Sequence, residues 1–170
     1  MKNFKELLRN IKAMVFDVDG VLTDGTLLLM PDGELIRTMN IRDGIVMKLA
    51  VKKGYHLCII TGGNNMAVKQ RLNRLGITDV YLKTENKWEA MKEFLATYDL
   101  KTEEVLYMGD DLVDHEVMTK IGVPTCPKDA VPEIKAISVY VSGVNGGKGC
   151  VRDVVEQVMK LHGKWEIPKW

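Results

Sequence analysis

Several carboxylates of this chain lie just after short apolar runs, at two places far apart in the sequence. Asp17 and Asp19 follow the first run, and Asp110, Asp111 and Asp114 follow a later one. Carboxylates that converge in one crevice repel each other unless a cation lies among them, and hard oxygen ligands of this kind suit Mg²⁺. Beside such a cation one carboxylate can attack phosphorus, and a second, two residues away, can donate and accept protons. The grouping therefore predicts Mg²⁺-dependent phosphoryl transfer.

Two further polar residues stand at the same kind of position. Thr61 follows the apolar run 57–60 and precedes two glycines, and Lys87 begins a predicted helix. Taken singly, each feature has a plainer explanation, since aspartates cap helices and turns, a threonine fits an ordinary turn and a lysine is usually solvated. We favour the joint interpretation because a parallel sheet would gather all of them, in this order, along one edge.

The elements that must position these residues alternate between strands and helices. Four unalternated apolar runs are typical of strands buried on both faces: 13–16, 57–60, 105–108 and 138–141. Amphipathic stretches predict helices over 43–53, 65–75, 87–98, 111–121 and 151–162. This alternation predicts an α/β fold, a doubly wound, Rossmann-like parallel sheet with helices on both faces. Since no linker or repeat interrupts the pattern, residues 1–170 are expected to form a single domain.

One segment breaks the alternation. Residues 26–40 contain two β-rich runs around Pro31, Asp32 and Gly33, a strong turn signal, and predict a β-hairpin inserted after the first strand. Such a hairpin would stand beside the carboxyl edge of the sheet, where ligands bind in doubly wound folds. The rest of the interval between Asp19 and Thr61 holds one predicted helix, which leaves no room for a cap domain.

Composition argues against several other classes. The 170 residues carry 24 basic and 23 acidic side chains, a formal net charge of +1, without the basic stripe with which a nucleic-acid binder contacts phosphates. No stretch approaches the roughly 18 apolar residues of a membrane span. The three cysteines are odd in number and widely spaced, which favours buried thiols over disulfides. We therefore expect a cytoplasmic protein with no nucleic-acid or membrane partner.

The order of these polar residues resembles the four motifs of the haloacid dehalogenase superfamily of phosphotransferases, over residues 13–126. The resemblance implies that Asp17 is the nucleophile and that Asp19 is the general acid and then the general base. It also implies that Thr61 and Lys87 hold the transferring phosphoryl oxygens. The presence of Asp19 indicates a phosphatase or phosphomutase, because the dehalogenases of the superfamily lack an aspartate there.

The same resemblance implies a ligand set for Mg²⁺. Asp110 would bind the metal together with the carboxylate of Asp17 and the main-chain carbonyl of Asp19. Asp111 and Asp114 would support the metal from further out. This division agrees with the chemistry, since phosphoryl transfer depends on positioning and charge neutralisation more than on covalent help from the protein.

A narrower resemblance is to the capless branch of that superfamily, and within it to the phosphatases of 3-deoxy-D-manno-octulosonate 8-phosphate (KDO 8-phosphate), an eight-carbon 2-keto sugar acid phosphate. The segment 40–44, Asn-Ile-Arg-Asp-Gly, matches that family, and so does the glycine-rich segment 146–152. The implied reaction releases the sugar acid and phosphate through an aspartyl-phosphate, a step in making lipopolysaccharide precursors. The implied substrate-binding residues are Asp19, Asn40, Ile41, Arg42, Asp43, Gly44, Thr61, Gly62, Arg71 and Lys87.

Arg42 is the sharpest candidate for specificity, because a guanidinium can bind the carboxylate of a keto acid through two hydrogen bonds. An alternative stays open for each of three residues in this set. Arg42 could form a surface ion pair on its helix, and Arg71 could lie on the surface. Asp43 could either bind sugar hydroxyls or cap its helix.

The resemblance also implies a homotetramer in which each hairpin helps to roof the site of a neighbouring subunit. The apolar run 27–30 fits a segment that needs cover, although packing inside its own subunit would explain it too. The last residues, 164–170, cannot continue the final helix past Pro168. Related phosphatases have a C-terminal tail that can enter a neighbouring active site, and the resemblance therefore implies that Trp165 and Ile167 are packing anchors in this chain. The alternative is a disordered tail, Trp170 included.

Three rival functions remain at this level. The main rival is a phosphatase for a nine-carbon 2-keto sugar acid 9-phosphate. A receiver domain of two-component signalling is also doubly wound, but its acidic pair follows the first strand and its phosphoacceptor a middle strand, the reverse of the order here. A catalytically silent relative of the fold is disfavoured because Asp17, Asp19, Lys87 and Asp110 are all present.

Overall fold

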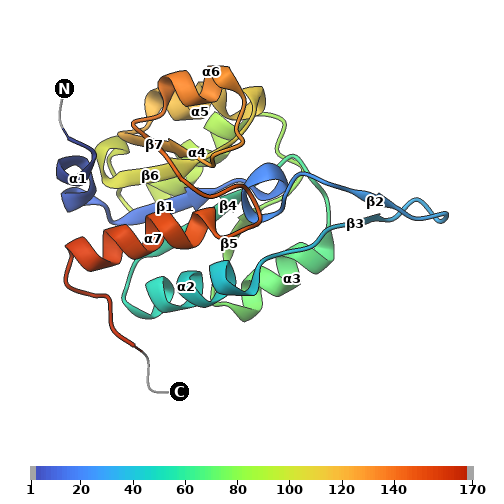
Figure 1. The fold of residues 1–170 in the computed structure, drawn as a ribbon, viewed down its shortest axis with the longest axis horizontal. Coiled ribbons are helices and arrows are strands. Elements are labelled where there is room, and N and C mark those ends of the chain that lie inside the picture. The colour runs from blue at the N-terminus through green and yellow to red at the C-terminus, as the bar shows by residue number, and fades with distance from the viewer. Residues whose placement is uncertain (1–2, 168–170) are drawn as a thin grey trace.

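A six-stranded parallel sheet organises the chain, with β1 paired to β4 on one side and to β6 on the other (Figure 1). The computed structural model describes residues 3–167. The strand order is β5–β4–β1–β6–β7–β8. The strands are β1 (Ala13–Phe16), β4 (His56–Ile60), β5 (Asp79–Tyr81), β6 (Val105–Met108), β7 (Val123–Cys126) and β8 (Tyr140–Val141). The predicted α/β architecture with a parallel sheet is confirmed.

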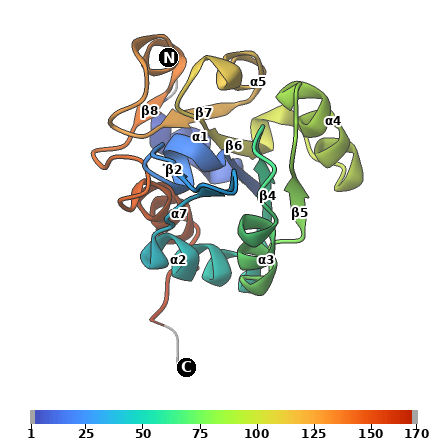
Figure 2. The same ribbon diagram turned by 90° about the vertical axis from the view of Figure 1, so that its right-hand side faces the viewer.

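Helices cover both faces of this sheet. One face carries α2 (Ile41–Lys52), α3 (Met66–Arg74) and α7 (Cys150–Leu161). The other face carries α4 (Lys87–Thr97), α5 (His115–Lys120) and α6 (Pro132–Ile137) (Figures 1 and 2). A short helix, α1 (Phe4–Leu7), precedes β1. The carboxyl ends of the strands are left open on one edge, as expected for a doubly wound fold.

The burial of β1 explains why its sequence does not alternate between polar and apolar residues. Met14 and Phe16 point into the core beneath α2, α3 and α7, whereas Ala13 and Val15 point into the core beneath α4, α5 and α6. All four residues are fully buried. A strand covered on both faces has no polar side, so its hydrophobic run is continuous.

Some predicted boundaries differ from the structure. The run 138–141 contributes only the two residues of β8, and the helix expected over 111–121 begins at His115, after a 3₁₀ turn over Leu112–Asp114. That turn forms because the Asp111 carboxylate accepts a hydrogen bond from the backbone N–H of Leu112. The sequence pattern did not predict β7, because Pro124 lies in it and proline normally argues against an internal strand.

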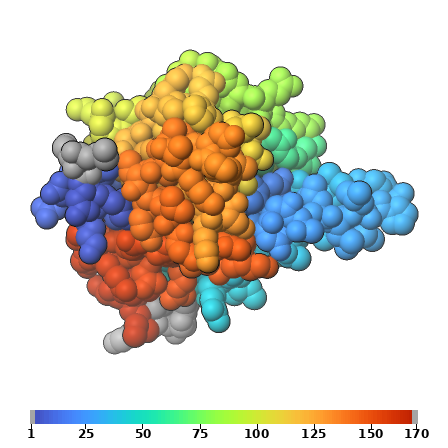
Figure 3. Space-filling model, turned by 45° about the horizontal axis from the view of Figure 1, so that its top comes forward, coloured from blue at the N-terminus to red at the C-terminus, as the bar shows by residue number. Residues whose placement is uncertain are grey.

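The predicted hairpin is present and projects from the body of the molecule (Figures 1 and 3). It pairs β2 (Leu28–Leu29) with β3 (Leu35–Ile36) in antiparallel register, and Gly33 at its tip has φ +86°. Both strands are short, and their apolar side chains are open to solvent: Leu28 is 61% and Leu29 72% exposed. The hairpin therefore lacks the cover that such side chains normally receive.

The C-terminal segment packs on the body as far as Trp165. The indole of Trp165 is partly buried against the core, with the cationic groups of Arg152 and Lys160 lying 5.7 and 5.8 Å from its ring centre. Ile167, the other expected anchor, is 92% exposed. Trp170 lies outside the described residues. Across positions 3–167, the structure contains no helix that is both long and apolar enough to cross a membrane.

Candidate active site

The first loop of the site begins where β1 ends. Asp17 is 5% exposed, and its Oδ1 accepts a hydrogen bond of 2.6 Å from the backbone N–H of Val18. The following turn, Val18–Leu22, is interrupted at Asp19 and at Gly20, which has φ +86°. A Cβ on Gly20 would collide with the carboxylate of Asp110, so glycine is required where these two loops meet.

A buried lysine joins two of the carboxylates. The Nζ atom of Lys87, at the start of α4, lies 2.6 Å from Asp17 Oδ2 and 2.7 Å from Asp114 Oδ1. Burial lowers the pKa of Lys87, but the charges of the two aspartates outweigh it and raise the pKa above its ordinary value. The lysine is therefore a cation, and it compensates part of the negative charge in the site.

Asp114 accepts a hydrogen bond from this lysine and from two other groups of the site. Its Oδ1 also accepts a 2.7 Å hydrogen bond from the hydroxyl of Tyr107 on β6, and its Oδ2 accepts one of 3.1 Å from the backbone N–H of Asp110. Asp114 and Tyr107 are both fully buried. The sequence did not point to Tyr107, because an aromatic residue in an apolar strand is typical of core packing.

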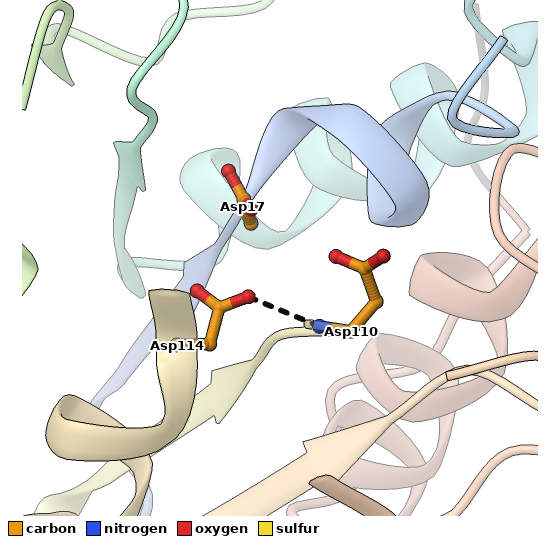
Figure 4. A group of neighbouring side chains, drawn as sticks. All are labelled: Asp17, Asp110 and Asp114. Carbon is orange, nitrogen blue, oxygen red and sulfur yellow. Dashed lines mark hydrogen bonds between the residues drawn. The ribbon is translucent and has the colours of Figure 1, made fainter. Parts of the chain in front are cut away.

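Three carboxylates converge at the carboxyl ends of β1 and β6 (Figure 4). Oxygens of Asp17, Asp110 and Asp114 lie within 4.8 Å of one another, and Oδ1 of Asp110 is buried without a hydrogen-bond partner. Burial, followed by repulsion from Asp114, raises the pKa of Asp17 to about 7, although Lys87 opposes the shift. Burial, followed by the charges of Asp17 and the other aspartates, raises the pKa of Asp110 to about 8.

This geometry fits a divalent cation. An unpartnered buried oxygen and neighbouring carboxylates of raised pKa are costly for the protein alone, and a hard cation with oxygen ligands would relieve both costs. The Asp110 carboxylate also lies against Gly20, the residue that follows Asp19 in the chain. Asp111 is exposed and caps the Leu112 turn, further from the centre of the cluster.

Thr61 stands at the carboxyl end of β4, next to this cluster. It is 3% exposed, and its Oγ1 accepts a 3.1 Å hydrogen bond from the backbone N–H of Gly63. A cavity of about 440 Å³ is lined by Asp17, Asp19, Thr61, Gly62, Lys87 and Asp110, among others. The structure thus brings together residues of all four predicted motifs around one cavity.

Arg37 is a site residue that the sequence reasoning missed. Its guanidinium holds the carboxylate of Asp19 through two bonds, Nε to Oδ1 at 2.7 Å and Nη2 to Oδ2 at 3.0 Å. A single arginine at the end of a hairpin strand resembles an ordinary solvated residue. The chain returns from the projecting hairpin to the body of the molecule just after β3, and this return places Arg37 beside Asp19.

A second cavity, of about 890 Å³, adjoins the first and shares Gly62 and Gly63 with it. It runs between the hairpin and α3, and Arg37 and Arg71 both line it. Arg71 also lies against α2: a Cβ added to Gly44 would be 2.8 Å from its Nη2 atom. Arg71 is therefore placed beside a cavity large enough for the organic part of a substrate.

The segment 40–44 lies differently from the expected sugar pocket. Asn40 caps α2 by accepting from the N–H of Arg42 at 2.8 Å, and its Nδ2 donates to Gly147 O at 3.3 Å. Asp43 is fully buried and accepts a 2.7 Å bond from the N–H of Arg152. In this single chain, none of the residues 40–44 lines either of the two cavities.

Arg42 and Ile41 are both exposed near the start of α2. Arg42 lines a separate pocket of about 610 Å³ with Lys148, Arg152 and Lys160, along α7. Within one chain the structure therefore does not bring Arg42 to the carboxylate cluster. Arg42 therefore cannot contact a substrate carboxylate in the site of its own chain.

Comparison with known proteins places this geometry in a family. Residues 74–153 match the family model for haloacid dehalogenase-like hydrolases. A 3-deoxy-D-manno-octulosonate 8-phosphate phosphatase from Yersinia pestis is 36% identical over 92% of this chain and 84% of its own length. A crystal structure of the phosphatase from that organism superposes with a TM-score of 0.92, at 34% identity, covering 95% of this chain and 87% of the other.

A phosphatase of the same name from Moraxella catarrhalis, solved with a magnesium ion, a phosphate ion and KDO, superposes with a TM-score of 0.89 at 27% identity. The match covers 93% of this chain and 91% of that one. Identity at this level over almost the whole chain, with all four motifs around one cavity, settles the family. The chain belongs to the haloacid dehalogenase-like hydrolases, in the family of the 3-deoxy-D-manno-octulosonate 8-phosphate phosphatases.

Proposed function

We propose that this protein is a Mg²⁺-dependent phosphatase that hydrolyses 3-deoxy-D-manno-octulosonate 8-phosphate to the free sugar acid and phosphate. The observation that carries the proposal is the contact of Lys87 with both Asp17 and Asp114, beside the unpartnered oxygen of Asp110. This arrangement supplies a nucleophile, a cation for the phosphoryl group and a metal site in one cavity. The names of the relatives supply the substrate.

In the first half of the reaction a carboxylate oxygen of Asp17 attacks phosphorus in line with the leaving oxygen. The bond between phosphorus and the sugar oxygen breaks, and Asp19 gives that oxygen a proton. Lys87 and Thr61 hold the phosphoryl oxygens while charge builds on them. The products are the free sugar acid and an aspartyl-phosphate on Asp17.

In the second half, Asp19 takes a proton from water, and the water oxygen attacks the phosphorus of the aspartyl-phosphate. The acyl-phosphate bond breaks, which restores the carboxylate of Asp17 and releases inorganic phosphate. Asp19 therefore works first as acid and then as base, and each half returns it to the state that the other half requires.

The carboxylates of Asp17 and Asp110 and the main-chain carbonyl of Asp19 would hold Mg²⁺. When bound, the ion neutralises negative charge on the phosphoryl group and on the nucleophile. Asp114 would support the site from further out by fixing Lys87 and the backbone N–H of Asp110. Asp111 would do so by holding the turn Leu112–Asp114.

The part of the substrate beyond the phosphate would occupy the second cavity, where Arg71 offers a guanidinium. The segment 40–44, including Arg42, stays a prediction for substrate recognition. In one chain Asn40 and Asp43 hold α2 and α7 together instead, and Arg42 faces another pocket. If the segment contacts substrate, the contact involves a surface that a neighbouring subunit completes.

A homotetramer is the assembly we propose, with sites at the subunit interfaces. The exposed apolar side chains of the hairpin support it, since a monomer would leave them in water: Leu27, Leu28, Leu29, Met30, Leu35 and Ile36. We propose the cytoplasm as the compartment, which agrees with three free and buried cysteines: Cys58, Cys126 and Cys150.

Replacing the nucleophile tests the mechanism. Asp17→Asn removes one oxygen of the attacking carboxylate, so phosphate release from KDO 8-phosphate with Mg²⁺ should fall to background. Asp99→Asn, at an exposed position after α4, makes the same change of charge and serves as the control. Retained turnover by Asp17→Asn, with a circular dichroism spectrum like that of the wild type, would refute the mechanism.

A further inference from the structure

Arg37 and Asp19 form an ion pair in which the arginine side chain is nearly buried and the aspartate side chain is partly exposed. The side chain of Arg37 is 7% exposed, whereas that of Asp19 is 37% exposed. Both oxygens of Asp19 are engaged, by Nε at 2.7 Å and by Nη2 at 3.0 Å. Two parallel bonds fix the plane of a carboxylate as well as its position, which a single contact does not do.

Arg37 is itself held in place by a hydrogen bond to the hairpin backbone. Its Nη1 donates to the carbonyl of Leu35 on β3 at 3.1 Å, and the same carbonyl accepts from Nδ2 of Asn65 at 3.2 Å. The Oδ1 of Asn65 caps α3 by accepting from the N–H of Val68. The guanidinium is thus tied to the hairpin and, through Leu35, to the start of α3.

The pair of Arg37 and Asp19 joins the two cavities, and this explains what the contact does. Asp19 lines the smaller cavity with Asp17 and Lys87, and Arg37 lines the larger one behind it. An aspartate side chain open to a cavity otherwise exchanges between rotamers. General acid catalysis needs the carboxyl group within hydrogen-bond reach of the leaving oxygen, so free rotation would lower the fraction of productive encounters.

We propose that Arg37 is a positioning residue, whose two-bond grip fixes the carboxylate of Asp19 where it faces the leaving oxygen of the substrate. This inference rests on the proposed phosphatase activity. Arg37 acts through Asp19 and takes no part in bond making. The hairpin therefore serves catalysis from within its own subunit, in addition to any role in assembly.

A series of leaving groups tests this proposal. As the bond from phosphorus to oxygen breaks, an alkoxide needs a proton from Asp19 far more than p-nitrophenolate does. Arg37→Ala should therefore lower kcat/KM on the order of 100-fold for alkyl phosphates, the size of a lost general acid, and only slightly for p-nitrophenyl phosphate. We would measure kcat/KM because it reports the steps up to transfer onto Asp17 and excludes the later hydrolysis, which all substrates share.

The substrates are p-nitrophenyl phosphate, phenyl phosphate, glycerol phosphate and KDO 8-phosphate. The plot of log kcat/KM against the pKa of the leaving group should be steeper for Arg37→Ala and for Asp19→Asn than for the wild type. Arg37→Lys, which keeps one donor to Asp19, should give an intermediate slope. Arg74→Ala, an exposed arginine on α3 that lines neither cavity, should reproduce the wild-type line.

Two results would overturn the proposal. One is an equal loss for every substrate, which would show that Arg37 only stabilises the fold. The other is a loss for KDO 8-phosphate alone, in which its KM rises while the slope for the other esters stays unchanged. That result would show that Arg37 binds the substrate carboxylate. If Arg37→Ala does not fold, the slope of Arg37→Lys decides. A wild-type enzyme inactive on all four esters would instead refute the proposed phosphatase activity itself.

Discussion

The ammonium of Lys87 lies 2.6 Å from Oδ2 of Asp17, and both side chains are almost fully buried. A buried ion pair of this kind is costly to form and still more costly to break, because a lone charge is left without solvent. Here the pair costs free energy of folding and places a cation where a phosphoryl group would bind. The site is therefore organised for chemistry at some expense of stability.

Replacing Lys87 should damage both activity and stability. Lys87→Met leaves Asp17 and Asp114 facing each other, so the free energy of unfolding should fall by about 3 kcal/mol, as measured by urea denaturation. The kcat/KM for KDO 8-phosphate should fall by more than roughly 100-fold, since no cation replaces the lysine at the phosphoryl group. Lys92→Met, which removes an exposed ion pair with Glu89 on the same helix, should have little effect on either quantity. A Lys87→Met enzyme with near wild-type activity would contradict the assigned role.

Replacing Asp110, a proposed metal ligand, should weaken the stabilisation that Mg²⁺ gives the protein. Mg²⁺ should raise the Tm of the wild-type protein, and the increase should be larger at pH 8 than at pH 6. Carboxylate ligands must lose their protons to bind the metal, and the pKa values of Asp17 and Asp110 are raised to about 7 and about 8. Asp110→Asn should lower the affinity for Mg²⁺ by at least roughly tenfold by calorimetry. Asp99→Asn is again the control. An unchanged affinity for Mg²⁺ in Asp110→Asn would remove that residue from the site.

The buried carboxyl group of Asp43 should make stability depend on pH. Burial raises its pKa from 3.8 to about 6, against the backbone hydrogen bond from Arg152, and its Oδ2 has no partner. The folded state therefore holds the proton more tightly than the unfolded state does. The stabilisation is complete below about pH 4 and disappears as the pH rises through 6.

This effect is measured against Asp43→Asn, which does not titrate. Relative to that variant, the wild-type free energy of unfolding should fall by about 1 kcal/mol between pH 5 and pH 7.5, from urea denaturation at each pH. The asparagine keeps an oxygen that can accept from the N–H of Arg152. A difference between the two proteins that stays constant over this range would show that Asp43 is ionised throughout.

The exposed hairpin predicts how the assembly responds to substitution. Changing Leu28 and Leu29 together to serine removes apolar surface that is 61% and 72% exposed in one chain. If neighbouring subunits cover the hairpin, the double variant should dissociate from a tetramer into smaller species in sedimentation velocity, because the apolar area buried at the interface is lost. Val139→Ser, at an apolar side chain that is 43% exposed just before the edge strand β8, is the matched comparison. An unchanged sedimentation coefficient for the hairpin variant would refute this interface.

Much of the site was predictable because of a general property of parallel sheets. Residues that follow β1, β4 and β6 meet at one edge, so the sequence order alone placed Asp17, Thr61 and Asp110 near each other. The continuous apolar run of β1 likewise reported a strand buried on both faces. The sequence pattern predicted best where the strands end and which residues follow them.

The contacts that depend on side-chain direction were less predictable. Tyr107 is typical of a core residue by its sequence surroundings, yet its hydroxyl supports Asp114. Arg37 reaches Asp19 only because the chain returns from the hairpin to the loop after β1, which no local pattern records. The segment around Arg42 matches a family motif, but the structure shows that Asn40 and Asp43 tie α2 to the region around α7.

The central claim, hydrolysis of an eight-carbon substrate, is tested most directly by comparing two phosphates side by side. With saturating Mg²⁺, kcat/KM for phosphate release is measured on KDO 8-phosphate and on a nine-carbon 2-keto sugar acid 9-phosphate. A pocket that distinguishes one carbon unit typically discriminates by about 10-fold or more, so the eight-carbon ester should be preferred by at least that factor. Preference for the nine-carbon ester would contradict the assignment.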